Sequence, residues 1–353
     1  MSDKNLKDIK SYNLKELEAD FKAINLPKFR AKQVYEWLHK KLVIDFDSMS
    51  NLSKDLREKL KEDYFITGIE TELVQTSKLD GTKKYLFKLS DGNFVESVLM
   101  RYHHGNSVCI SSQVGCRMGC RFCASTLDGL TRNLLPSEML DEIYQIQKET
   151  GERVHNIVLM GTGEPMDNYD NVVRFLHMVT DPEGLNISQR NITVSTCGIV
   201  ENMRKLADEK FQITLALSLH SVTDEKRREL MPIANKYSIE EIMQACEYYF
   251  EKTGRRITFE YSLVRDVNDR DEDAEGLIKL ARRVGAHVNL IPVNPIKERD
   301  YRETEHAAVV AFKNKLEKSR INVTIRREMG RDIDGACGQL RKRHMDGAKR
   351  EDA

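Results

Sequence analysis

Strand-like and helix-like segments alternate along most of this chain, and the alternation limits the possible folds more than any other feature. A repeated strand–helix unit predicts a parallel sheet with right-handed crossovers. Six such units predict an α/β core, curled into a partial (β/α)6 barrel over residues 102–330. The strand-like runs lie at 107–113, 155–161, 191–198, 213–220, 256–264 and 287–294. The clearest amphipathic helices lie at 136–150, 238–253 and 271–284.

The segments on either side of this core have different patterns. Residues 1–66 carry apolar side chains at helical spacing, with Ser53 as a candidate N-cap and Pro27 between two helices. We therefore predict a small helical N-terminal domain there. Residues 67–101 alternate around the turn sequences LDG and SDG, which predicts a β-hairpin connector. The charge-rich, Gly-containing stretch 331–353 predicts a C-terminal loop and tail.

Charge and composition exclude some classes of protein but do not identify a partner. Lys plus Arg equals Asp plus Glu, at 56 each, so the total charge indicates no nucleic-acid partner, although a neutral total can hide a strongly basic face. The sequence has no apolar signal core and no apolar run of about 18 residues, so we expect a cytoplasmic protein that does not enter a membrane. In that reducing compartment, seven unevenly spaced cysteines favour metal binding or thiol chemistry over a disulfide framework.

Four of these cysteines fall within the stretch CISSQVGCRMGCRFCAST. Cys116, Cys120 and Cys123 form a C-x3-C-x2-C motif after the first core strand. Three thiolates on one tight loop can bind one iron–sulfur cluster, and Gly115 and Gly119 allow the backbone to bend around it. A [4Fe-4S] cluster closed by protein needs four ligands, so three leave one iron open for a substrate or cofactor.

Two other kinds of site are alternatives for the same cysteines. A structural zinc site would take His103, His104 or a distant cysteine as its fourth ligand, but such sites more often pair two-ligand knuckles. A redox dithiol of the thioredoxin type needs C-x2-C beside a helix start and leaves Cys116 without a role. The motif therefore favours the cluster.

The motif also carries a resemblance to a known family. C-x3-C-x2-C with Phe122 before the last cysteine, after the first strand of a βα barrel, resembles the radical S-adenosylmethionine (SAM) superfamily. The resemblance covers about residues 102–330. It implies that the amine and carboxylate of SAM bind the open iron, and that an electron from the cluster splits SAM into a 5′-deoxyadenosyl radical. It also implies an electron donor such as flavodoxin or ferredoxin.

The loops that follow the other core strands match this family. MGTGEPMDN follows the second strand and looks like the family's GEP motif, in which Gly163 and Glu164 receive the SAM amino group. Polar residues end other strands at the edge where such barrels build active sites, although each alone is as often a turn former. By the resemblance, the further SAM contacts, through side chains or backbone, are Ser195, Ser218, Leu219, His220 and Asn294.

Two further cysteines narrow the resemblance from the superfamily to one family within it. Cys109 lies on the first core strand, and Cys337 lies in GRDIDGACGQL, a Gly-rich polar segment suited to a thiol that must travel. A lone cysteine is usually a small buried apolar residue. This pair, with NFVESVLM upstream, makes the chain resemble the RlmN/Cfr family of RNA methyltransferases through Leu340. Cys197 and Cys246 match no role in that family, and we interpret both as structural.

The RlmN branch of that family implies a specific reaction. Its product is 2-methyladenosine at one adenine of the 23S rRNA peptidyl transferase centre and at position 37 of certain tRNAs. The resemblance implies that the Cys337 thiolate takes a methyl group from one SAM, and that a radical from a second SAM activates this S-methyl group. It also implies Glu96 as general base, and Cys109 as the thiol that releases the RNA by forming a disulfide with Cys337. Without the resemblance, Glu96 is better explained as a solvated strand carboxylate.

Three alternatives remain open at this point. The Cfr branch methylates carbon 8 of the same rRNA adenine and shares the cluster, both cysteines and the SAM loops, but overall similarity favours the RlmN pattern. A noncatalytic zinc RNA-binding protein needs no SAM loops. An iron–sulfur electron carrier normally closes its cluster with four protein ligands.

An RNA substrate requires a basic surface near the chemical site. Arg326, Arg327, Arg331 and the stretch 341–343 are candidate phosphate contacts, and the helical domain 1–66 is a candidate second RNA surface. The target adenine must leave its stack to reach the cluster. We expect a monomer whose partners are 23S rRNA and tRNA.

Overall fold

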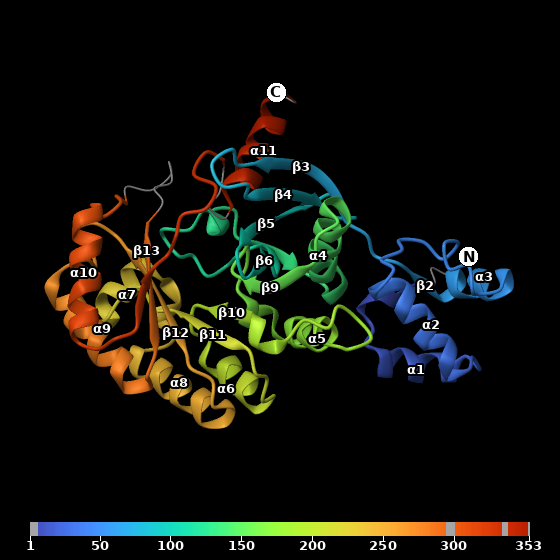
Figure 1. Ribbon diagram of the computed structural model, residues 1–353, viewed down its shortest axis with the longest axis horizontal. Helices are drawn as coiled ribbons and strands as arrows, with labels where there is room; N and C mark the ends of the chain where they lie inside the picture. The colour runs from blue at the N-terminus through green and yellow to red at the C-terminus, as the bar shows by residue number, and fades with distance from the viewer. Residues whose placement is uncertain (1–5, 294–300, 334–337, 352–353) are drawn as a thin grey trace.

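A single twisted sheet forms the centre of the molecule. The computed structural model describes residues 6–293, 301–333 and 338–351 (Figure 1). Within these ranges the main sheet has ten strands in the order β14-β13-β12-β11-β10-β9-β6-β5-β4-β3. The strands from β6 to β14 are parallel, and the described strands do not close the sheet, which confirms an α/β core with a partial barrel. The parallel strands are β6 (Gly105–Cys109), β9 (Val154–Leu159), β10 (Ile192–Thr196), β11 (Thr214–Ser218), β12 (Thr258–Leu263), β13 (His287–Pro292) and β14 (Val323–Ile325).

Helices cross between these strands and cover the outer face of the sheet (Figure 1). Their ends follow local sequence signals. α4 has Pro136 in its first turn and ends at Gly151, whose φ of 69° suits glycine. α8 begins with a capping box between Ser238 and Glu241. The helices are α4 (Pro136–Thr150), α5 (Tyr169–Val179), α6 (Val200–Asp208), α7 (Asp224–Leu230), α8 (Ile239–Thr253), α9 (Asp271–Val284) and α10 (His306–Lys318).

The segment expected as a connector is part of the main sheet. Strands β3 (Glu70–Thr76), β4 (Lys83–Lys88) and β5 (Phe94–Tyr102) are antiparallel and extend the sheet beyond β6. The strands and turns of this segment are as the sequence predicts. The sequence did not predict that β5 pairs with β6 and so joins the hairpin to the core sheet. This pairing aligns β5 with the strand that carries Cys109, because Val98 pairs with Cys109.

The N-terminal region is a helical unit with its own apolar core, built from α1 (Leu14–Ala23), α2 (Lys28–His39) and α3 (Lys54–Asp63). The short strands β1 (Lys7–Asp8) and β2 (Tyr64–Phe65) pair at its edge. The Lys10 Nζ donates to the Asp141 Oδ1 on α4 at 2.8 Å, and both side chains are buried. Removing one partner would leave the other charge buried and unpaired, at a cost of about 3–5 kcal/mol, so the two side chains must stay together where the helical unit meets α4.

The C-terminal region differs from the expected loop and tail. Residues Gln339–Glu351 form helix α11, which lies beside β3, β4 and β5 (Figure 1). Its sequence has few apolar residues at helical spacing, which is why the pattern did not predict a helix. The helix begins instead at a tertiary contact, because Glu96 of β5 accepts a hydrogen bond from the Arg341 amide. No helix in the described ranges is long and apolar enough to cross a membrane.

Candidate active site

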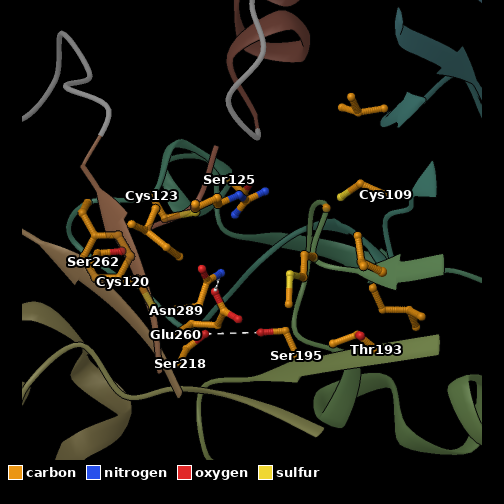
Figure 2. Close-up of a pocket in the computed structure, with 18 of the residues that line it drawn as sticks. Cys109, Cys120, Cys123, Ser125, Thr193, Ser195, Ser218, Glu260, Ser262 and Asn289 are labelled. Carbon is orange, nitrogen blue, oxygen red and sulfur yellow. Dashed lines mark hydrogen bonds between the residues drawn. The ribbon is translucent and has the colours of Figure 1, made fainter. Parts of the chain in front are cut away.

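A cavity of about 860 Å³ lies within the curve of the parallel strands and reaches the loops at their carboxyl ends (Figure 2). The three motif cysteines, Cys109 and polar side chains of six strands line it. In a closed βα barrel this interior is usually filled by branched apolar residues. Here it is hollow and lined by both polar and apolar side chains, so the fold leaves room for a large ligand.

The cysteine loop follows β7 (Gln113–Gly115), which pairs with β8 (Leu130–Asn133) in a separate two-stranded sheet. The loop therefore begins one short strand later than the sequence suggests. Gly115 has φ of 75°, and an added Cβ would lie 2.0 Å from the Gly129 oxygen, so only glycine fits there. Thr126 Oγ1 donates to the carbonyls of Cys120 and Cys123 and fixes the curve of the loop.

All three motif cysteines line the cavity. Burial raises the pKa of Cys116 to about 12 and raises that of Cys120 well above its usual value. Such thiols become thiolates when a metal centre supplies positive charge. Among the described side chains, no three His, Cys, Asp or Glu meet as ligands of one metal ion. A [4Fe-4S] cluster binds each cysteine through a different iron, so its ligands need to line one cavity rather than meet at a point.

Glu164 is held rigidly on the loop after β9. Its Oε1 accepts the Met166 amide at 3.0 Å, and its Oε2 accepts the Cys197 amide at 2.8 Å. Burial raises the pKa of this carboxyl. Gly163 has φ of 109°, and an added Cβ would lie 2.6 Å from the Gln113 Cβ. Glycine thus lets the loop pack against the cysteine-bearing segment, which brings a carboxylate and the three thiols into the same cavity.

Three of the other expected SAM contacts line the cavity, and two do not or are not described. Ser195 and Ser218 line the cavity, and their hydroxyl oxygens are 3.3 Å apart (Figure 2). His220 also lines it; its Nδ1 accepts the Ser262 amide, and burial lowers its pKa to about 3, so the ring is neutral. The Leu219 side chain is buried in the apolar core, and its amide donates to the Glu260 carbonyl. Asn294 lies outside the described residues.

Cys109 and Glu96 lie on neighbouring strands. Cys109 ends β6, is buried and lines the cavity (Figure 2). Glu96 of β5 is 4% exposed and forms an ion pair of 3.0 Å with the fully buried Lys84. Glu96 Oε2 also accepts the Gly338 amide at 2.7 Å, and its Oε1 accepts the Arg341 amide at 2.6 Å. Glu96 is therefore a buried, well-bonded carboxylate rather than a solvated one.

Gly338 packs directly against the cysteine loop. Its φ is 79°, and an added Cβ would lie 2.8 Å from the Ser125 amide nitrogen and 3.1 Å from the Ala124 carbonyl carbon. Ala124 follows Cys123, and Gly338 follows Cys337 in the sequence. Cys337 itself lies outside the described residues. The packing nevertheless ties the chain next to Cys337 to both the cysteine loop and β5.

The basic residues expected at an RNA surface are divided between the cavity and the interior. Arg326, Arg327 and Arg331 line the cavity. Arg341 is 6% exposed, so its guanidinium is not available at the surface. Lys342 lies near Asp128, at 3.4 Å, on the same side as the cysteine loop.

Comparison with known proteins assigns the family. Residues 110–281 match the family model described as the radical SAM superfamily, and residues 5–66 match the ribosomal RNA large subunit methyltransferase N-terminal domain. A protein from Lachnospira eligens named probable dual-specificity RNA methyltransferase RlmN is 66% identical over 339 residues, covering 96% of this chain and 97% of the relative. The chain belongs to the RlmN family. A relative of the same name from Clostridium novyi is 53% identical over 340 residues, covering 96% of this chain and 99% of its own.

A solved structure agrees with the assignment to the RlmN family. A radical SAM methyltransferase from Sphaerobacter thermophilus superposes with a TM-score of 0.88 and 40% sequence identity. The match covers 94% of this chain and 98% of the other. Membership in the radical SAM superfamily implies a [4Fe-4S] cluster and SAM. The three cavity-lining thiols and the adjacent buried carboxylate of Glu164 are a donor set that fits both.

One side chain that shapes the site of this RlmN-family chain is not indicated by any sequence pattern. Arg227 is fully buried on α7. Its guanidinium donates to the carbonyls of Leu219 and Cys197, at 3.1 and 2.6 Å, and joins the loops after β11 and β10. It lies in the charged run DEKRREL, where nothing distinguishes it from solvated neighbours. Its role follows from the tertiary fold alone.

Proposed function

We propose that this protein is a radical SAM RNA methyltransferase that forms 2-methyladenosine in 23S rRNA and at position 37 of tRNA. One observation carries the proposal. Cys109 and the three motif cysteines line one cavity, and Gly338, next to Cys337, packs against the loop that carries the motif. Carbon 2 of adenine is neither nucleophilic nor acidic, so polar methyl transfer does not reach it. A cavity that holds the motif cysteines and the Cys109 thiol, beside the segment that follows Cys337 in the sequence, supports radical methyl transfer better than polar methyl transfer.

The proposed ligands follow from the cavity lining. Cys116, Cys120 and Cys123 hold the cluster, and Glu164 with Gly163 binds the SAM amine. When bound, the two cofactors supply a methyl group and a radical that abstracts hydrogen. The remaining proposed SAM contacts are Ser195, Ser218 and His220 from the cavity, Leu219 through its backbone, and Asn294 beyond the described residues.

Two cysteines of this chain carry the methyl carbon and release the product. Cys337 takes the methyl group as a thiolate. After this S-methyl group loses a hydrogen atom to the radical, its carbon becomes joined to the adenine, and one electron leaves the adduct, for which the oxidised cluster would be the acceptor. Cys109 then attacks the Cys337 sulfur. A sulfur–sulfur bond forms while the bond between that sulfur and the RNA-bound carbon breaks, and a proton on that carbon completes the methyl group.

Glu96 is the proposed base for the proton on carbon 2 of the adduct. Its hydrogen bond with Gly338 sets it beside the chain that carries Cys337. Its Oε2 accepts the Gly338 amide and pairs with Lys84, whereas its Oε1 accepts the Arg341 amide alone. Each carboxylate oxygen has two lone pairs, so Oε1 keeps one that can take a proton while the hydrogen bonds hold the side chain in place.

The RNA surface is proposed around the cavity. Arg326, Arg327 and Arg331 are the candidate phosphate contacts, together with Lys342 and Arg343 of α11. The helical unit that Lys10 fixes to α4 is the candidate second surface. A monomer, a cytoplasmic location and reduction by flavodoxin or ferredoxin complete the proposal. The full-length match to relatives named RlmN supports carbon 2 over the carbon 8 of the Cfr branch.

Nucleoside analysis tests this proposal. Anaerobically reconstituted protein is incubated with SAM, a reductant and a short unmodified 23S rRNA fragment, and the digested RNA is analysed by mass spectrometry. We expect 2-methyladenosine with the wild-type protein and none with Cys337→Ala. 8-Methyladenosine would place the protein in the Cfr branch. Unmethylated RNA despite a full cluster and SAM cleavage would refute the RNA substrate and leave the radical SAM family assignment intact.

A further inference from the structure

The interior beside Glu96 contains a lysine to which the proposed mechanism gives no role. Lys84 of β4 is fully buried, and its Nζ lies 3.0 Å from the Oε2 of Glu96. Burying an ammonium group is costly unless a charged partner compensates it. Even a compensated pair adds little stability, because well-packed apolar side chains of similar volume often serve as well. Stability therefore explains the pair weakly, and its place beside the proposed base indicates a role in the reaction.

The register of the sheet places Lys84 on the same face as the reacting groups. Lys84 pairs with Val98 of β5, and Val98 pairs with Cys109 of β6. Residues directly opposite each other on neighbouring strands point to one face, and so do residues two apart along a strand. Val98 and Cys109 line the cavity, which identifies this face as the cavity side. Glu96 stands two residues before Val98 and therefore shares it.

Three described groups hold the Glu96 carboxylate, and they come from two different parts of the chain. The amides of Gly338 and Arg341, at 2.7 and 2.6 Å, belong to the C-terminal segment that follows Cys337. Lys84 belongs to the main sheet. In the proposed function, Cys337 meets SAM, the adenine and the releasing thiol in turn, so its travel displaces the amides beside it first. The hold of the sheet lysine on the carboxylate does not depend on that travel.

We propose that Lys84 is a positioning residue for Glu96. Its ammonium group holds Oε2, so the open lone pair of Oε1 keeps its direction while the C-terminal segment changes position. The proton on carbon 2 of the adduct passes to Oε1, the electron pair of the broken carbon–hydrogen bond stays in the ring, and Lys84 keeps its own protons. The inference rests on the proposed function, in which Glu96 removes this proton, and it names the group that holds the base in place.

Single-turnover methylation separates proton removal from the earlier steps. Protein that already carries the methyl group on Cys337 is incubated anaerobically with SAM, a reductant and the 23S rRNA fragment, with hydrogen or deuterium on carbon 2 of the target adenine. Lys84→Met is expected to release 2-methyladenosine about tenfold more slowly, because a positioned base contributes about 10²–10⁴-fold and a displaced one loses part of that. The RNA–protein adduct should accumulate, and the deuterium isotope effect should rise above that of the wild type. Lys84→Arg keeps the positive charge and should restore most of the rate.

A double variant keeps the test valid if Lys84→Met alone folds poorly. Lys84→Met combined with Glu96→Gln removes both charges of the buried pair. It should release the product no more slowly than Glu96→Gln alone, because a positioning residue has no effect once its base is gone. Losses that add in the double variant would show that Lys84 acts independently of Glu96, and they would overturn the inference.

The neighbouring lysine provides a matched control. Lys83 precedes Lys84 on β4 and points to the other face, where its Nζ lies 2.8 Å from the Glu149 Oε1 on α4. Lys83→Met should therefore keep the wild-type rate of adduct release.

Two further outcomes decide between a positioning role and a structural one. If Lys84→Met loses methyl transfer to Cys337, SAM cleavage and adduct release to the same extent, its role is structural and the inference is wrong. Wild-type release from Lys84→Met beside slow release from Glu96→Gln would also refute the inference while leaving the base assignment intact. Wild-type release from Glu96→Gln would refute the proposed base itself, and this separates the two failures.

Discussion

Gly338→Ala is expected to lower the methylation rate roughly 100-fold while cluster content stays unchanged. The added Cβ would lie 2.8 Å from the Ser125 amide nitrogen, and the backbone there has φ of 79°. Steric overlap and left-handed backbone strain together cost about 3 kcal/mol, which opposes docking of the chain next to Cys337 on the cysteine loop. The measurement is single-turnover methylation of the RNA fragment, with iron content determined in the same samples.

A second glycine provides a matched control for this variant. Gly92 has φ of 80° in the turn between β4 and β5, and an added Cβ there would have no other atom within 4 Å. Gly92→Ala therefore carries the backbone strain without the overlap, and it should retain the wild-type rate. A Gly338→Ala protein that methylates as fast as Gly92→Ala would contradict the docking contact.

Cys120→Ala is expected to remove both the cluster and all methylation. Cys120 lies on the loop after β7, where its carbonyl accepts a hydrogen bond from Thr126 Oγ1. The two cysteines that remain in the variant do not hold a [4Fe-4S] cluster stably. Iron and acid-labile sulfide should fall from about four each per chain to near zero. SAM cleavage to 5′-deoxyadenosine should disappear with them.

Cys246→Ala is the matched control for the cluster. Cys246 is fully buried on α8 within the main apolar core, where alanine substitutes for a small apolar side chain. This variant should keep its iron and its SAM cleavage. A protein that kept its cluster after Cys120→Ala and lost it after Cys246→Ala would overturn the ligand assignment.

Local patterns predicted the parts of the fold that depend on nearby residues. The strands β9 to β13 follow from apolar runs, and α4 and α8 follow from helical spacing with caps such as Ser238. Ser53 caps α3, and Pro27 stands before α2, as expected. These signals lie within a few residues of the element that they shape, so the sequence contains them directly.

The parts of the fold and the site that the sequence did not predict depend on contacts between residues far apart in the chain. Helix α11 forms where Glu96 accepts its first amides, although the two are more than 200 residues apart. The pairing of β5 with β6 joins the hairpin to the core through a register that no local pattern specifies. In the site, the cysteine motif and the GEP loop were visible, whereas Lys84 and Arg227 acquire their positions only when strands and loops assemble.

A trapped covalent adduct is the most direct test of the central claim that the methyl carbon passes from Cys337 to RNA. Cys109→Ala protein is incubated with SAM, a reductant and the 23S rRNA fragment, separated on a denaturing gel, and mapped by mass spectrometry after digestion. Because Cys109 lines the cavity and is the proposed releasing thiol, we predict an RNA–protein adduct on Cys337 and little free methylated RNA. Free 2-methyladenosine at the wild-type rate with no adduct would contradict the account.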